Sequence, residues 1–316
     1  MKKKVLYTGP VEFTGALQEV IGPDFEVERT EPDDSLLAKF EKADVFMDAS
    51  MKVRVPASTI EKAANLKLIV TATTGADHID QKALAARNIP ILTLSGQKEF
   101  LKGLSAAAEH SWLLLLAVSR KLRSAIHHVE GGGWDRVQFP GIMMRNRTLG
   151  VIGMGRIGSL MARYARAFEM NVLGYDSEIK EFSQDATPTE LDLLLATSDI
   201  VTIHIPRNDA TKNFFDAKKI NMMKKGAILI NTSGGSIIDE EALVKALEEG
   251  RVAGVGTDVL DTEPKNEDSP LWRHAKNNEN VIITPHIGGF CPEAVGLSIR
   301  FSGERILKYY KENNLL

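Results

Sequence analysis

Cysteine is almost absent from the sequence. Cys291 is the only one in 316 residues, so no internal disulfide can form, and no CxxC motif or Cys/His spacing typical of a metal site accompanies it. Structural disulfides are a feature of oxidising compartments. We therefore predict a reduced, cytoplasmic protein with no metal site.

The sequence also lacks an excess of charge of either sign. The formal net charge is -3, and the charged residues, which make up 26% of the chain, are interspersed in sign along it. A protein that binds nucleic acid usually carries a basic stripe or tail, and none is present. We therefore expect no nucleic-acid partner.

Long apolar runs are missing as well. The longest, Trp112–Val118, falls far below the ~18 residues that a membrane-spanning helix needs. The basic start of the chain is followed by the apolar run Val5–Tyr7, which ends at Gly9 and Pro10 and is too short for a signal peptide. We therefore predict no membrane segment, and we interpret the N-terminal run as a strand.

The chain is long enough for two domains, because single hydrophobic cores usually stop growing near ~250 to 300 residues. In its first part, short apolar runs alternate with segments of helical periodicity such as Leu36–Lys42 and Ser58–Ala64. This alternation is typical of a parallel sheet with helices on both faces. The predicted strands are Val5–Thr8, Phe25–Arg29, Asp44–Asp48, Leu66–Ala72 and Ile89–Leu94.

Composition changes near Gly96, where a long helical pattern, Ser105–Ile126, begins. The pattern is apolar nearly all round at Trp112–Leu116, so the helix is expected to be buried on more than one side. A central helix beneath the sheet and a subunit interface explain this equally well. Two helix starts are also predicted from capping-box spacing, at Thr187–Glu190 with Pro188 in the first turn, and at Ser236–Asp239.

Strands and helices alternate again to the end of the chain. The predicted strands are Thr148–Ile152, Asn171–Tyr175, Ile200–Ile205, Ala227–Thr232, Val252–Val259 and Val281–Thr284. The predicted helices are Arg156–Phe168, Lys212–Met223, Asp239–Glu249 and Glu293–Tyr310.

A glycine-rich stretch, Gly150–Gly158, lies between a predicted strand and a predicted helix. In this context Gly153 permits a tight turn, Gly155 lets the backbone approach a pyrophosphate, and Gly158 lets helix and strand pack closely. The next strand ends at Asp176, where a carboxylate can accept hydrogen bonds from the ribose hydroxyls of a dinucleotide. An acid there would repel a 2′-phosphate, and the nearest following cation is Lys180. The sequence therefore predicts a site for NAD rather than NADP.

A second turn, Thr73–Asp80, follows the predicted strand that begins at Leu66. Open α/β sheets bind ligands at the carboxyl ends of their strands. The backbone N–H groups of this turn could therefore hold an anion, although the segment is also compatible with a simple strand-to-helix connection.

His286 and Glu263 are the candidates for acid–base chemistry. Reduction of a ketone by NADH needs a group that protonates the developing alkoxide, and histidine is the usual choice. His286 follows a predicted strand directly, and Glu263 also follows a strand end. A carboxylate beside an imidazole fixes its tautomer and favours the protonated form.

Four motifs in order resemble the D-isomer-specific 2-hydroxyacid dehydrogenases, a family that includes the phosphoglycerate dehydrogenases. They are the glycine motif ending at Asp176, Asn231–Leu243, Gly256–Val259 with Glu263-Pro264, and Thr284–Gly289. The resemblance runs from about Asp44 to about Phe290.

The resemblance implies two Rossmann-like or flavodoxin-like domains with parallel sheets. The substrate domain would be discontinuous, residues 1–99 and 290–316, with an NAD-binding domain, residues 100–289, inserted into it and the active site in the cleft between them. It also implies a homodimer formed through the cofactor domain, which would account for the apolar helix at Trp112.

The resemblance assigns roles by position. His286 matches the proton donor, Glu263 the acid that pairs with it, and Gly75 and Ala76 the turn that holds the substrate carboxylate. The positions that match cofactor contacts are Arg156 and Ile157 at the pyrophosphate, Asp176 at the ribose, His204 and Pro206 beside the adenosine, and Thr232, Asp258, His286 and Gly288 on the nicotinamide side.

One position departs from the family pattern. The family carries an arginine where this chain has Gly234, and its guanidinium binds the substrate carboxylate and polarises the ketone. A guanidinium donates two parallel hydrogen bonds to a carboxylate, whereas glycine has no side chain to donate any. Losing one partner of a buried charge pair costs about 2 to 5 kcal/mol, so impaired turnover is expected.

Three interpretations of Gly234 stay open. It is a single substitution within an otherwise intact motif, or another cation serves in its place, with Lys52, Arg54 and Lys98 as candidates. Alternatively, the protein is an NAD(H)-binding sensor that does not turn over substrate. The predicted reaction is the reversible reduction of a small 2-keto acid by NADH to a D-2-hydroxy acid.

Overall fold

The computed structural model describes residues 2–31, 35–50, 53–179 and 182–316. It divides into two compact units, the first formed by Met1–Gly103 with Cys291–Leu316 and the second by Leu104–Phe290. Each unit contains one sheet, and every strand pair in both sheets is parallel. This confirms the predicted α/β class with two parallel-sheet domains.

The first unit has a five-stranded sheet in the order β2-β1-β3-β4-β5. This is a doubly wound order of the flavodoxin type. The strands are β1 Lys3–Thr8, β2 Phe25–Arg29, β3 Val45–Asp48, β4 Leu68–Thr71 and β5 Ile91–Leu92. Strands β3 and β4 are buried along their whole length, because helices cover both faces of the sheet.

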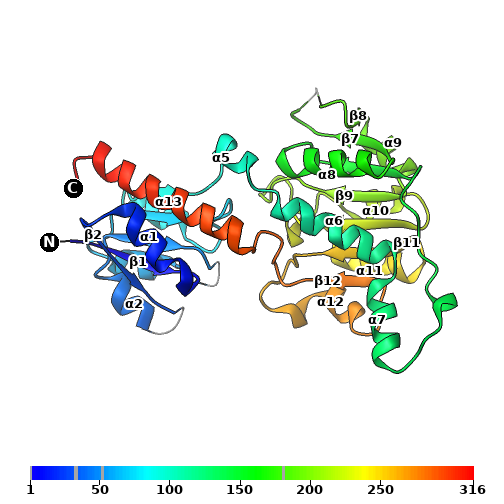
Figure 1. Cartoon of the computed structure of the whole chain (residues 1–316), viewed down its shortest axis with the longest axis horizontal. Helices are drawn as coiled ribbons and strands as arrows, with labels where there is room; N and C mark the ends of the chain where they lie inside the picture. Colours follow the sequence, from blue (N-terminus) through cyan, green and yellow to red (C-terminus); the bar gives the residue numbers. More distant parts are fainter. Residues whose placement is uncertain (1, 32–34, 51–52, 180–181) are drawn as a thin grey trace. The chain divides into compact units, whose positions relative to one another are not determined.

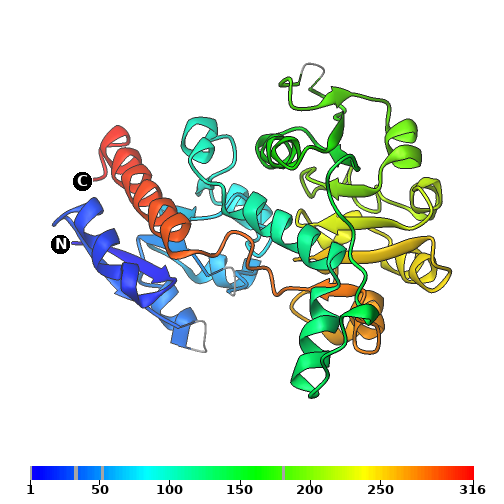
Figure 2. The same ribbon diagram turned by 45° about the vertical axis from the view of Figure 1, so that its right-hand side comes forward.

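Two apolar clusters fill the space between this sheet and its helices. One contains residues of α1 (Thr14–Ile21) and α13 (Pro292–Glu312), two helices that lie side by side although they come from opposite ends of the chain (Figures 1 and 2). The other contains residues of the helices on the opposite face. Those helices are α2 Ser35–Phe40, α3 Ala57–Lys62 and α4 Gln81–Ala86. The unit is completed by η1 Val11–Phe13 and α5 Lys98–Lys102.

The second unit has a seven-stranded sheet in the order β12-β11-β10-β9-β6-β7-β8. Strand β6 therefore lies between β7 and β9, and the order of the strands reverses there, as in dinucleotide-binding Rossmann domains. The strands are β6 Thr148–Ile152, β7 Asn171–Tyr175, β8 Thr187–Pro188, β9 Ile200–Ile203, β10 Ala227–Asn231, β11 Val252–Thr257 and β12 Val281–Ile283.

Helices cover both faces of this sheet as well (Figure 1). One apolar cluster joins the sheet to α6 Ala106–Ser119 and α8 Arg156–Ala167, and another joins it to the helices of the opposite face. Those helices are α9 Leu191–Thr197, α10 Ala217–Met222, α11 Glu240–Glu248 and α12 Pro270–Ala275. Short 3-10 turns are η2 Arg136–Gln138, η3 Gly235–Ile237 and η4 Asn266–Asp268.

The prediction of one long helix over Ser105–Ile126 is wrong. The chain forms α6 and then a separate helix, α7 Leu122–Glu130, with Lys121 between them in the left-handed conformation at φ 49°. Helix α6 contacts β10, β11 and β12, and Trp112 is only 9% exposed. The ring of Trp112 packs against those of Tyr164 and Phe168, in and at the end of α8. The sheet and α8 together therefore cover the apolar side chains of α6, which agrees with the interpretation of a central helix.

The helix start predicted at Thr187–Glu190 is also wrong. The helix predicted over Asp239–Glu249 is confirmed by α11, but its cap is not the one that the Ser236–Asp239 spacing indicates. Thr187 and Pro188 form the edge strand β8, and α9 begins three residues beyond Pro188, at Leu191, with Glu190 as its N-cap. Ser236 belongs to a 3-10 turn, and the cap of α11 is Asp239, whose side chain accepts a hydrogen bond from the N–H of Ala242. In the part of the chain that the structure describes, no helix has the length and apolar character needed to cross a membrane.

Candidate active site

The glycine turn lies where the strand order of the second unit reverses. The N–H of His204, just after β9, donates to the carbonyl of Ile152 at the end of β6 over 2.7 Å. Gly153 has a φ of 90°, and a Cβ atom there would lie 2.5 Å from the carbonyl oxygen of His204. Only glycine satisfies both constraints, so the two strand ends approach each other closely.

The other two glycines of the motif have different roles. A Cβ atom at Gly158 would lie 1.9 Å from the carbonyl oxygen of Gly153, whereas one at Gly155 would meet no atom within 4 Å. Gly158 therefore permits close packing of α8 on β6, and the space beside Gly155 is open. This arrangement fits a pyrophosphate, which needs room at the turn and N–H donors behind it.

Those donors are at the N-terminus of α8, which contains Arg156 and Ile157 in its first turn. Gly155 is the N-cap, and no side chain caps the helix, so its first N–H groups suit an anion. The guanidinium of Arg156 donates to the carbonyl of Leu104. In this structure that side chain holds α8 against the segment before α6, and the backbone of residues 156 and 157 is the part suited to the phosphates.

Asp176 follows β7, and the turn around it holds its carboxylate in place. One oxygen accepts the N–H of Met154 at 2.8 Å, and the other accepts those of Glu178 and Ile179 at 2.9 and 3.0 Å. A carboxylate only accepts hydrogen bonds, which suits it to the hydroxyl groups of a ribose. Its bond to Met154 places it directly beside the glycine turn.

His204 and Pro206 lie in the loop after β9. The Nε2 atom of His204 is 2.7 Å from Oγ1 of Thr202, while its buried Nδ1 atom has no hydrogen-bond partner among the described residues. Burial lowers the pKa of His204 to about 3, so the imidazole is neutral at physiological pH. The contact of His204 and Pro206 with an adenosine stays a prediction of the family resemblance.

Asp258 holds the turn that carries His286. Its carboxylate accepts the N–H groups of Ile287 at 2.9 Å and Gly288 at 2.7 Å, as well as the hydroxyl of Thr284 at 2.6 Å. A Cβ atom at Gly288 would lie 2.9 Å from this carboxylate, so glycine permits the approach. The side chain is 3% exposed, and its hydrogen bonds satisfy the buried charge.

His286 adopts a left-handed backbone conformation, with φ at 54°. Its N–H donates to the carbonyl of Asp258 at 2.9 Å. Its Nδ1 atom is 3.2 and 3.3 Å from the two carboxylate oxygens of Glu263. The hydrogen bond to Glu263 raises the pKa of His286 above its ordinary value, and burial and the positive charge of Arg207 act in the opposite direction. The structure thus brings the two predicted acid–base residues together.

Thr232 and His110 connect this region to α6. The hydroxyl of Thr232 is 2.7 Å from that of Ser111, and Ser111 in turn donates to a carbonyl of its own helix. His110 Nε2 is 2.8 Å from the hydroxyl of Thr284 and 3.3 Å from the carboxylate of Asp258. Because Thr284 donates to Asp258, its oxygen can accept the Nε2–H of His110.

The remaining predicted substrate residues are in the first unit. Gly75 and Ala76 follow β4, in a turn closed by the hydroxyl of Thr73 donating to the carbonyl of Gly75 at 2.7 Å. Arg54 and Lys98 are exposed. Lys52 lies outside the described residues.

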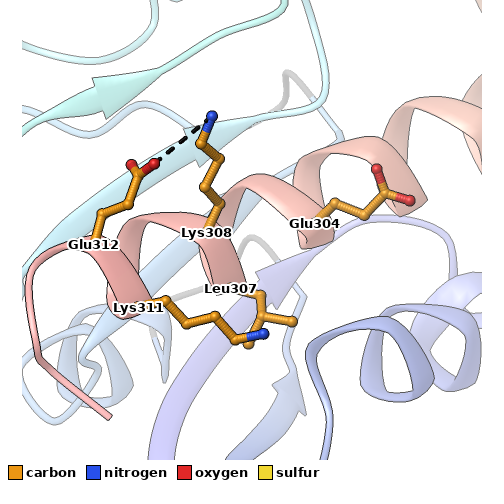
Figure 3. Close-up of a pocket in the computed structure, with 5 residues that line it drawn as sticks. All are labelled: Glu304, Leu307, Lys308, Lys311 and Glu312. Carbon is orange, nitrogen blue, oxygen red and sulfur yellow. Dashed lines mark ion pairs between the residues drawn. The ribbon is translucent and has the colours of Figure 1, made fainter.

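A surface hollow of about 360 Å³ lies on α13 in the first unit. Its lining residues, Glu304, Leu307, Lys308, Lys311 and Glu312, all come from this one helix (Figure 3). Lys308 and Glu312 form an exposed ion pair of 3.7 Å. An exposed ion pair of this kind contributes little to stability.

Comparison with known proteins identifies the family. A model of the NAD-binding domain of the D-isomer specific 2-hydroxyacid dehydrogenases matches residues 112–288, and a model of the catalytic domain of the same family matches residues 10–111. The chain belongs to this family. Its second unit is therefore an NAD-binding domain, as the glycine turn and Asp176 predict.

Individual relatives show the same relationship. The chain is 36% identical over 276 residues to D-3-phosphoglycerate dehydrogenase of Archaeoglobus fulgidus, covering 86% of this chain and 50% of that one. It is 33% identical over 301 residues to glyoxylate reductase of Aeropyrum pernix, covering 90% of this chain and 87% of the relative. The chain thus spans about half the length of the phosphoglycerate dehydrogenase.

Among solved structures, D-lactate dehydrogenase of Aquifex aeolicus, complexed with NAD and lactic acid, matches with a TM-score of 0.82. The sequences are 29% identical, and the match covers 98% of this chain and 96% of that one. The family fold therefore extends over almost the whole chain.

Two residues near the pair formed by His286 and Glu263 were not predicted from the sequence. His110 is in a helix far from His286 along the chain, and no local pattern indicates its contact with Thr284. Arg207 is three residues beyond His204, in a polar loop where an arginine is unremarkable. Only the packing of the loop shows that it lies beside Gly234.

The hydrogen bonds of Asp258 lead to a prediction about stability. In Asp258→Asn, an amide NH₂ replaces one acceptor, and at least one buried backbone N–H faces another donor. We expect a loss of about 1 to 3 kcal/mol of unfolding free energy, measured by urea denaturation. Asp261→Asn, an exposed neighbour, is the control and should change stability by less than ~0.5 kcal/mol. Equal stability of the two variants would contradict the role of Asp258.

Proposed function

We propose that the chain is an NAD-dependent D-2-hydroxyacid dehydrogenase, which reversibly reduces a 2-keto acid to a D-2-hydroxy acid. The observation that carries the proposal is the pairing of His286 with Glu263 beside the carboxyl end of an NAD-binding sheet. Ligands of open α/β sheets bind at this end. The family assignment supports the reaction class and its D stereochemistry.

The reaction adds a hydride to the ketone carbon and a proton to the ketone oxygen. NADH, when bound, supplies the hydride. His286 supplies the proton, and Glu263 holds the Nδ1 side of its ring, which leaves Nε2 for the transfer. In the reverse direction neutral His286 accepts the proton from the hydroxyl group.

The proposed substrate is a small 2-keto acid or 2-hydroxy acid. The names of the relatives support this class, since they include a phosphoglycerate dehydrogenase, a glyoxylate reductase and a D-lactate dehydrogenase. Such substrates are anions at neutral pH. We also propose that the protein is cytoplasmic, on the basis of its single cysteine.

Gly234 impairs turnover only if no other cation binds the substrate carboxylate in place of the missing arginine. In that case the wild type reduces every 2-keto acid slowly, and Gly234→Arg reduces some of them much faster. The alternative is an NAD(H)-binding sensor, in which neither chain turns over substrate. The buried support of Asp258 under His286 favours an enzyme, because a sensor has no need of a positioned proton donor.

We further propose a homodimer formed through the NAD-binding unit. Helix α7 projects from the rest of this unit in both views (Figures 1 and 2). Together with the segment after it, α7 exposes a series of large apolar side chains. They are Leu122 43%, Ile126 46%, Val129 52%, Trp134 91%, Val137 79% and Met143 71% exposed. An apolar set of this size on one segment is typical of a protein interface.

The proposed activity is tested by titrating the protein with NADH and following NADH oxidation with a panel of 2-keto acids, including glyoxylate, pyruvate and hydroxypyruvate. We expect saturable NADH binding, weaker binding of NADPH because Asp176 repels a 2′-phosphate, and turnover of at least one keto acid. NADH binding without any turnover would favour the sensor. Failure to bind NADH would overturn the proposal.

The pH dependence follows from the raised pKa of His286. Reduction requires the protonated imidazole. The value of kcat/KM for the keto acid is therefore at its maximum below the pKa of His286 and falls as the pH rises through that pKa. In Glu263→Gln the main cause that raises this pKa is removed, and the alkaline limb should move to lower pH. Glu267→Gln, an exposed residue of the same loop, should leave the limb in place. An unmoved limb in Glu263→Gln would argue against His286 as the proton donor.

The dimer is tested by light scattering coupled to size exclusion. The wild type should have twice the monomer mass, and the double variant Ile126→Glu/Val129→Glu should be monomeric, because two charges within an apolar interface are not solvated. Leu193→Glu, at a residue 57% exposed on α9, is the control and should stay dimeric. A monomeric wild type would refute the proposed interface.

A further inference from the structure

The space beside Gly234 is occupied by the side chain of Arg207. A Cβ atom at position 234 would lie 2.9 Å from Cδ, 3.0 Å from Cβ and 3.1 Å from Cγ of Arg207. The backbone of Gly234 is extended, with φ -169° and ψ 139°, a conformation open to any residue. Glycine is therefore not required here by the backbone, and the volume that a side chain would use is filled by the methylene groups of Arg207.

The two residues meet because their strands are neighbours. Arg207 follows β9 and Gly234 follows β10, and these strands pair in parallel, so both loops leave the same edge of the sheet. The hydroxyl of Ser233 donates to the carbonyl of Ile203 at 2.7 Å, which joins the two loops. The carbonyl of Gly234 accepts the side-chain amide of Asn231 at 3.0 Å, which fixes its position.

The loop that carries Arg207 is itself held in place. The hydroxyl of Thr211 donates to the carbonyl of Pro206 at 2.7 Å, and the same oxygen accepts the N–H of Asn208 at 2.9 Å. These bonds close the loop on either side of residue 207. The backbone at Arg207 is thus held in one place. Its exposed guanidinium therefore extends from a fixed point of the loop.

Arg207 is also electrostatically coupled to the proposed proton donor. Among the described groups whose charges shift the pKa of His286, Glu263 and Asp258 are anions and Arg207 is the cation. An anionic substrate beside His286 would therefore be repelled by two carboxylates and attracted by Arg207. This is the charge that a 2-keto acid needs close to its reacting carbonyl group.

We propose that the guanidinium of Arg207 binds the substrate carboxylate and polarises the ketone, in place of the arginine that the family resemblance expects at position 234. This inference rests on the proposed function. A guanidinium has five N–H donors, so Arg207 can hold a carboxylate while it keeps other interactions. The cation would then come from the NAD-binding unit itself and not from Lys52, Arg54 or Lys98.

The first test neutralises Arg207. Arg207→Gln should lower kcat/KM for the 2-keto acid by about 30-fold to several thousand-fold, the range for removing one partner of a desolvated charge pair. It should also weaken binding of oxamate, a non-reacting keto-acid analogue, to the protein–NADH complex, and leave NADH affinity unchanged. Arg207→Lys should recover part of the loss, because it restores the charge without the fork. Lys212→Gln, an exposed cation in the same loop, is the matched control.

The second test uses the shared space. Gly234→Arg alone should give little gain in kcat/KM, because its side chain competes with Arg207 for the same volume and the same substrate. In Arg207→Ala/Gly234→Arg the space is free for the new arginine, and activity should rise at least ten-fold above that of Arg207→Ala. NADH binding in each variant verifies that the protein is folded.

The pH profile supplies a third measurement. Because Arg207 lowers the pKa of His286, the alkaline limb of reduction should move to higher pH in Arg207→Gln, opposite to its movement in Glu263→Gln. An unmoved limb in Arg207→Gln would contradict the position of its guanidinium close to His286.

The outcomes separate this inference from the proposed function. An active wild type together with an Arg207→Gln variant that keeps both its kcat/KM and its oxamate affinity would overturn the inference alone. A wild type that binds NADH, reduces no keto acid and does not bind oxamate would overturn the proposed function and this inference with it. A large gain in Gly234→Arg would also overturn the inference, since it would show that position 234 is a lesion that Arg207 does not compensate.

Discussion

The candidate active site depends on one buried carboxylate, that of Asp258. It lies at the end of β11 and accepts hydrogen bonds from the backbone of the turn after β12, so two neighbouring strand ends are joined through a single side chain. A buried charge requires such partners, and the turn that provides them holds His286 at a positive φ. The cost of that backbone conformation, about 1 to 3 kcal/mol, is offset by charge-assisted hydrogen bonds.

Much of the second unit could be predicted from the sequence. Both β6 and β7 have the predicted bounds, because a buried parallel strand followed by a glycine turn or an acid has few alternative interpretations. The single long helix was not correct, since helical periodicity continues through Lys121 and only the left-handed φ of that residue ends α6. Capping boxes failed for a related reason. Thr187 and Pro188 pair with β7 as an edge strand, and strand pairing is not visible in a local pattern.

In the candidate site, too, some contacts could be predicted from the sequence and others could not. The proximity of His286 and Glu263 could be predicted, because the carboxyl ends of parallel strands lie at one edge of the sheet. The contact between Arg207 and Gly234 could not, since it depends on how a flexible side chain packs across two loops. A departure from a family motif identifies what is missing at one position. It does not identify which neighbouring residue fills the space.

The packing of Arg207 over Gly234 has a consequence for how such a chain can change. A substitution at either position changes the effect on activity of a substitution at the other, because the two side chains would occupy the same volume. A route from an arginine at 234 to an arginine at 207 must pass through an intermediate that has either two guanidiniums competing for space or none. The effects of substitutions in the two loops are therefore coupled. Effects measured one at a time in a chain with arginine at 207 would not hold in a chain with arginine at 234.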